Sequence, residues 1–328
     1  MFKKLFKTGP IGWQLAGQSL QVLRLDRELL MFPLMSGIAC LVLEVPFCIL
    51  FILSAGKEVL EVLGAVVGFL FFRGDLGQIA YQSWVLFIVA FPILFIWYLL
   101  HFFVVTFFNC ALVACSIIRL KGGDPNLKDG FAAAGGRFPQ IVGWAAVSST
   151  IGVIQSVIYW MFGGPLLSDD EGDSLGDLMA DLVGAAWRTV TYFVVPVIVV
   201  EEAGPLEAGK RSLQILKRTW CEVLGAEFGS GWIVFLVSVF CLVPLVLVGT
   251  LLGGGVLGVI CFVLVVLVWL ALTLVTSALD TIITAALYLY SVEGIVPQHF
   301  GEELLQGAFV KKTEETGEEA GDPAIQSD

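Results

Sequence analysis

Charged residues are scarce in this sequence, and their scarcity excludes a soluble globular protein. Only 14% of the 328 residues are charged, whereas 58% are hydrophobic. A soluble domain carries about 25% charged residues. Its core could not bury so much apolar surface, but a bilayer can, because each spanning helix needs about 20 mostly apolar residues. The composition therefore predicts a polytopic integral membrane protein.

Patterns typical of catalysis and ligand binding are also lacking. The two histidines, His101 and His299, are remote in sequence, and the seven cysteines form no CxxC pair. No GxSxG, P-loop or dinucleotide fingerprint occurs, so nucleophilic and nucleotide chemistry lack support. We therefore expect no enzyme, no cofactor and no metal site, and we interpret the cysteines as apolar packing residues.

The negative charge is concentrated in two segments. Residues 164–181 hold six acids and no base, and residues 301–328 hold eight acids and two bases, so the rest of the chain is close to neutral. No basic stripe indicates a nucleic-acid partner. We expect the tail at 301–328 to be disordered, because it is charged and poor in apolar residues.

Six apolar runs predict an all-α bundle of six transmembrane helices, because helices satisfy every backbone amide internally in lipid. The runs are 29–55, 83–118, 140–162, 182–200, 231–252 and 256–290. The second and sixth would exceed the hydrocarbon thickness as straight helices, so they must project into water, tilt or kink. A shorter run at 57–72 contains Glu61 and is interpreted as an interfacial or re-entrant helix.

The basic residues predict the orientation. Counted on alternate sides of these spans, fifteen bases fall on the side of the two termini and three on the other. The excess of Lys and Arg marks the cytoplasmic side. We therefore expect both termini in the cytoplasm.

A repeated element precedes some of the spans. The string SLQVLR begins at Ser19 and SLQILK begins at Ser212, and each follows a Gly-Pro pair, at Pro10 and at Pro205. Proline suits the first turn of a helix. We predict amphipathic helices at the cytoplasmic surface, in three units of one such helix and two spans. The alternative is that the likeness reflects only the shared physics of such helices.

Four strings carry a resemblance to a known family. They are VLRLDRELLMFP (22–33), FFNCALVACSIIRLKGGDP (107–125), FFVVPVIVVEEAGPLEAGKRS (193–212) and AALYLYSVEG (285–294). As a set, they resemble an uncharacterised bacterial integral-membrane family, a domain of unknown function, from Pro10 to about Val310. The resemblance implies a bacterial inner membrane and carries over no activity.

Polar residues inside the apolar runs are the candidate site, since a charge at the bilayer centre costs about 2.5–3.5 kcal/mol on insertion scales. Glu44 lies near the middle of the first run and His101 near the middle of the second. Asn109 follows two turns later, and Asp280 lies in the sixth run. In one hypothesis Glu44 and His101 face each other in a proton-coupled pathway. In the other, a protonated Glu44 only ties two helices together.

Two functions therefore stay open. The first is a non-catalytic scaffold or assembly factor of the inner membrane, favoured by the repeated surface helices. The second is a transporter or channel for a small or lipidic solute, with Glu44 and His101 in the pathway. Both divide the chain into a basic arm (1–28), a transmembrane domain (29–300) and the acidic tail (301–328). The partner is the lipid bilayer, and a homo-oligomer stays open.

Overall fold

The computed structural model describes residues 2–54, 76–162, 175–217, 256–301 and 305. These residues are helical or form short connections, and no strand occurs among them. The predicted all-helical class is therefore confirmed for this part of the chain. The predicted runs at 57–72 and 231–252 and the end of the tail lie outside it.

Four described segments are long and apolar enough to cross a membrane: Arg27–Pro46, Phe95–Leu120, Leu182–Glu201 and Val263–Glu293. They coincide with the first, second, fourth and sixth predicted runs. A membrane protein is thus supported, whereas the count of six spans stays a prediction.

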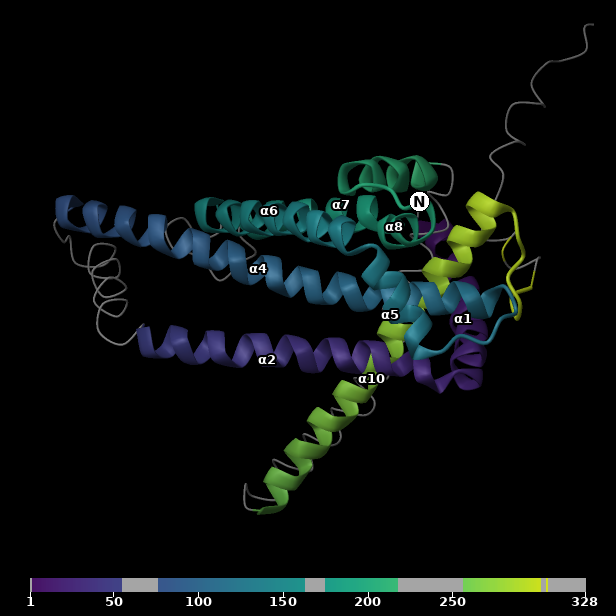
Figure 1. Cartoon of the computed structure of the whole chain (residues 1–328). Coiled ribbons are helices and arrows are strands. Elements are labelled where there is room, and N and C mark those ends of the chain that lie inside the picture. Colours follow the sequence, from purple (N-terminus) through teal and green to yellow (C-terminus); the bar gives the residue numbers. More distant parts are fainter. Residues whose placement is uncertain (1, 55–75, 163–174, 218–255, 302–304, 306–328) are drawn as a thin grey trace, which may run out of the picture.

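The chain begins with helix α1 (Phe2–Leu25), which turns through the short 3₁₀-helix η1 (Arg27–Leu30) into α2 (Met31–Ser54). The side chains that α1 buries recur every three or four residues, as on one face of a helix. They are Leu15, Ala16, Ser19, Val22 and Leu23. This face packs on protein, and Figure 1 shows α1 beside the ends of α4 and α10.

Helix α4 (Leu76–Leu120) is the spine of the molecule. It has 45 residues and continues through Pro92, where a kink was considered. At about 1.5 Å per residue it is roughly 68 Å long, so it extends well beyond a hydrocarbon layer of about 30 Å. Figure 1 shows α2 and α6 (Phe138–Phe162) side by side with it.

A short helix, α5 (Leu127–Gly136), returns along the last turns of α4. Asn126 caps it: its side chain accepts hydrogen bonds from the amides of Lys128 and Asp129, while Asp129 accepts one from the amide of Asn126. This reciprocal capping box satisfies amides that have no partner inside the helix.

The fourth predicted run forms two helices rather than one. Helix α7 (Leu175–Thr191) ends before Phe193, and α8 (Val194–Glu201) begins after it. The hydroxyl of Ser212, in the following helix at 205–217, occupies the break: it donates to the carbonyl of Val190 (2.6 Å) and accepts from the amide of Phe193 (3.1 Å). Pro196 lies in the first turn of α8, where its missing N–H costs little.

The last long helix, α10 (Val256–Tyr288), ends in a π-helical turn, η3 (Leu289–Glu293). Its second half is buried against α1, α4 and α8, whereas Leu264, Leu267 and Trp269 in its first half are exposed. Figure 1 shows this first half leaving α2 and α4 at an angle.

Three sharp corners of the same kind end α4, α8 and α10. Each has one residue in the left-handed region: Gly122 (φ 89°), Glu202 (φ 57°) and Gly294 (φ 66°). A proline follows three residues later in every case: Pro125, Pro205 and Pro297. A left-handed residue stops a helix, and proline cannot continue one. The ends of α4, α8 and α10 contact one another and contain the core of the described residues.

The repeated strings take up the same register in the structure. Ser19, Val22 and Leu23 are buried on α1, and their counterparts Ser212, Ile215 and Leu216 are buried on the helix at 205–217. The likeness therefore extends from sequence to packing for these two helices. Whether either helix lies at a membrane surface stays a prediction, as does the pairing of each unit with two spans.

Candidate functional site

The structure brings Glu44 of α2 and His101 of α4 together. Oε1 of Glu44 lies 3.2 Å from Nδ1 of His101, and the two side chains are 39% and 30% exposed. Trp97, one turn earlier on α4, has its ring centroid 5.8 Å from that of His101, and Phe102 meets the imidazole edge to face at 5.9 Å. The pair is thus walled on one side by aromatic rings and open on another.

The position of the pair along the helices places it at membrane depth. Glu44 lies 13 residues after Met31, where α2 begins, which is about 20 Å at 1.5 Å per residue. The hydrocarbon layer is about 30 Å thick. An ionisable pair at this depth is expensive unless its members neutralise each other, and that cost makes it a candidate for function.

The other two candidates lie apart from the contact. Asn109 is half-buried on α4, two turns after His101, and no polar contact of the described residues joins it to the pair. Asp280 is exposed on α10, and its backbone carbonyl accepts a hydrogen bond from the hydroxyl of Thr284 (2.8 Å). The binding role predicted for all four residues stays a prediction.

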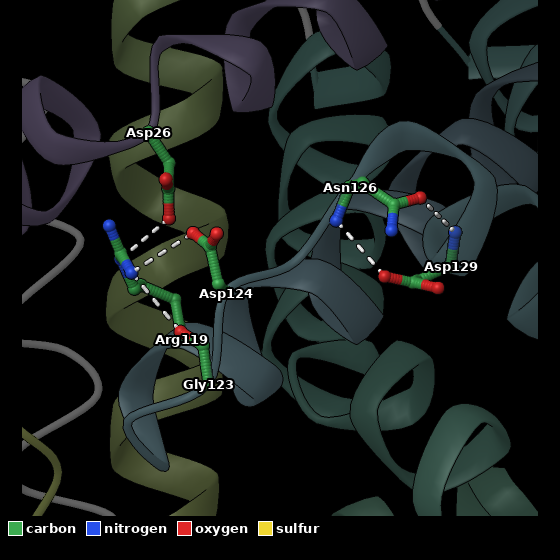
Figure 2. Close-up of polar contacts among 6 residues, drawn as sticks. All are labelled: Asp26, Arg119, Gly123, Asp124, Asn126 and Asp129. Carbon is green, nitrogen blue, oxygen red and sulfur yellow. Dashed lines mark hydrogen bonds and ion pairs between the residues drawn. The ribbon is translucent and has the colours of Figure 1, made fainter.

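A second polar cluster lies where the helices end, and sequence reasoning found only half of it. Arg119, at the end of α4, was expected to pair with Asp124. The structure shows that contact at 3.5 Å and a shorter one, 2.6 Å, from Nε of Arg119 to Oδ2 of Asp26 (Figure 2). Nη1 of Arg119 also donates to the carbonyl of Gly123 (3.1 Å). Asp26 stands between two bases in the sequence, which was the available signal.

This contact joins the α1–η1 turn to the end of α4 in a nearly buried setting. The side chains of Arg119 and Asp26 are only 20% and 12% exposed. Burial raises the pKa of the Asp26 carboxyl, and the guanidinium of Arg119 acts in the opposite direction. A pair that is largely removed from water is sensitive to the loss of either partner.

Further ion pairs link the other helix ends. Lys121 lies 2.7 Å from Glu293, so the corner after α4 is tied to η3. Glu201 accepts from Nε of Arg211 through both oxygens at 3.0 Å and from the hydroxyl of Tyr288 at 3.0 Å. We call this region, with the pair of Arg137 and Glu202, the ion-paired end; its members are Asp26, Arg119, Lys121, Arg137, Glu201, Glu202, Arg211, Tyr288 and Glu293.

The described residues contain no group of three or more His, Cys, Asp or Glu side chains that could hold a metal ion. Cys40, Cys110 and Cys115 are free thiols, and the last two are buried in the core. This placement agrees with their interpretation as packing residues.

The sequence matches the family described as "Family of unknown function (DUF6159)" over residues 88–298. The chain belongs to this family. The resemblance to a domain of unknown function is therefore confirmed, over a shorter stretch than the one expected from Pro10 to about Val310. No curated protein matches the chain.

The limits of the DUF6159 match divide the two polar clusters. The matched residues begin inside α4 and end just after Pro297, so they include all three corners and His101. Asp26 and Glu44 precede the match. One partner of each key contact, Asp26–Arg119 and Glu44–His101, thus belongs to the matched region and the other does not.

Proposed function

We propose that this chain is a non-catalytic protein of the bacterial inner membrane that organises or assembles partners at its ion-paired end, with both termini in the cytoplasm. The observation that carries the proposal is the closure of that end. The ends of α4, α8 and α10 pack apolar side chains with almost no exposure, among them Leu112, Ile198 and Ile282.

The ion pairs support the same role. They connect residues that are far apart in the chain, such as Lys121 with Glu293 and Asp26 with Arg119. A close-packed interior with several such cross-links is rigid. Several bases remain exposed at this end and are available to a partner: Arg24, Arg27, Lys128, Lys210 and Lys217. A rigid, closed and basic end is suited to holding other molecules rather than to passing a solute.

Photo-crosslinking in native membranes tests this role. A photoreactive amino acid replaces Lys128 or Lys210, both exposed at the ion-paired end, and in a control it replaces Val42, which is exposed on the apolar surface of α2. We expect discrete protein adducts from positions 128 and 210 and only lipid adducts from position 42. The absence of protein adducts at 128 and 210 would contradict an assembly role.

A second candidate, a transporter or channel for a small or lipidic solute, is favoured by the contact between Glu44 and His101. Its test is flux through proteoliposomes. Glu44→Gln and His101→Gln should each abolish a flux that the unchanged chain supports. If both variants leave the flux intact, the pair is not in the pathway.

A further inference from the structure

The contact between Glu44 and His101 requires a proton. At 3.2 Å, Nδ1 of His101 and Oε1 of Glu44 are near hydrogen-bonding distance. An ionised carboxylate offers only acceptors, and an unprotonated imidazole nitrogen is also an acceptor. Two acceptors repel each other, so one of the two atoms must carry hydrogen for the contact to be favourable.

Charge indicates how many protons the pair holds. With an imidazolium and a carboxylate, or with a neutral imidazole and a carboxylic acid, the pair is neutral overall. Removing one further proton leaves one negative charge at membrane depth, which costs about 2.5–3.5 kcal/mol on insertion scales. Neither side chain makes another ion pair among the described residues. The surroundings therefore favour the form with the extra proton.

The neighbouring titratable groups do not supply that charge. On α2, Cys40 lies one turn before Glu44, and on α4, Tyr98 lies three residues before His101. From α6, the nearest approach to this part of α4 is Gly152, beside the rings of Tyr98 and Phe102. Both neighbouring titratable groups are uncharged in their protonated forms, so the proton balance of the site is set by the pair itself.

Polar residues lead from the pair in one direction only. On α2, Ser36, Cys40 and Glu44 are spaced by four residues, which places them on one face. On α4, Asn109 lies two turns from His101 toward the same end. In the opposite direction, residues 84–100 of α4 contain no Ser, Thr, Asn, Gln or charged residue. Water and protons are better accommodated along the polar strip.

We propose that Glu44 and His101 form a proton-binding site that exchanges its proton with the ion-paired end, along the strip of Cys40, Ser36 and Asn109. The inference rests on neither function proposed above. A proton-linked transporter would use the site to couple flux, and an assembly protein would use it to couple the packing of α2 and α4 to pH.

Nuclear magnetic resonance of the histidines tests the binding. The chain has only two histidines, so ¹⁵N-labelled histidine in the full chain, purified with a histidine-free tag into lipid nanodiscs, gives two sets of imidazole signals. We expect the His101 signals to titrate and, in Glu44→Gln, to titrate at lower pH, because the carboxylate no longer stabilises the imidazolium. His299 is the internal control, and Glu207→Gln, which removes an exposed carboxylate, should change neither. A His101 titration unaffected by Glu44→Gln overturns the proton site.

Labelling of Cys40 tests the direction of exchange. In membrane vesicles of either orientation, a membrane-impermeant thiol reagent is applied and its attachment to the Cys40 peptide is read by mass spectrometry of the full chain. We expect modification from the side on which Lys128→Cys is modified, and loss of that modification in Ser36→Phe. Modification from the opposite side, or from neither, contradicts the proposed route even where the His101 titration behaves as expected.

Discussion

At the scale of single residues, the closest approach between two helices depends on Gly130. A Cβ at this position would lie 2.6 Å from Cζ of Phe32, 2.8 Å from Sγ of Cys115 and 2.9 Å from the carbonyl oxygen of Ala111. The last of these is backbone of α4 and cannot move alone. Gly130 is therefore the residue that lets α5 lie directly on α4.

Substitution of this glycine should destabilise the protein although alanine favours helices. We expect Gly130→Ala to lower the free energy of unfolding by about 1–3 kcal/mol, the usual cost of overpacking. Gly135→Ala is the matched control on the same helix, because nothing lies within 4 Å of its Cβ position. It should gain up to about 1 kcal/mol from helix propensity. Unfolding in mixed micelles, followed by tryptophan fluorescence, measures both; equal effects would contradict this packing.

Residue identity predicted some contacts and not others. Glu44 and His101 were recognisable because a charge is conspicuous in an apolar run, and their contact joins two predicted spans. Asp26 was missed as the partner of Arg119, because the α1–η1 turn carries it there and no spacing in the sequence reveals that turn. Local periodicity reports the face of a helix, whereas contacts between distant segments follow from the tertiary fold.

At the scale of elements, the corners that end α4, α8 and α10 are the repeated device. Two of them have glycine in the left-handed conformation, and the third has Glu202. A side chain in this conformation costs about 1–2 kcal/mol, which glycine avoids. The corner after α8 should therefore be strained relative to the other two.

The strain predicts opposite effects of two substitutions at one position. Glu202→Gly and Glu202→Ala remove the same carboxylate and with it the contact to Arg137. They differ only at the backbone, so Glu202→Gly should be more stable than Glu202→Ala by about 1 kcal/mol. Gly294→Ala, where nothing lies within 4 Å of the new Cβ, should lose a similar amount. These differences are measured as unfolding free energies, and Ala and Gly of equal stability at 202 would exclude a strained corner.

Helix bounds were predictable where the apolar pattern is continuous. The predicted run at 140–162 became α6 (Phe138–Phe162), and the run at 256–290 became α10 (Val256–Tyr288) followed by η3. The run at 182–200 gave no sign of its break before Phe193, because the hydrogen bonds that hold the break come from Ser212, about 20 residues later. Propensity cannot register a partner that distant.

At the scale of the whole molecule, the distribution of apolar surface agrees with a bilayer. Ile38, Val42 and Ile49 of α2 and Leu267 and Trp269 of α10 are exposed, and a soluble protein rarely leaves apolar patches of that extent open. The ion-paired end has the opposite character, with charges at its rim and a dry interior. The sequence predicted this division through its apolar runs and basic loops, but not that the helix ends would be locked by ion pairs.

This division predicts the orientation of the chain. Lys128 and Lys210 are exposed at the ion-paired end, which is the side of the basic excess, so both should face the cytoplasm. Lys128→Cys and Lys210→Cys should react with a membrane-impermeant thiol reagent in inverted vesicles but not in intact cells. Lys57→Cys, which the sequence assigns to the other side, is the control and should react in intact cells. Because the structure places residues 128 and 210 at the same end of the helices, opposite results for these two positions would contradict the arrangement of the helices, whereas reversal of all three would contradict only the orientation.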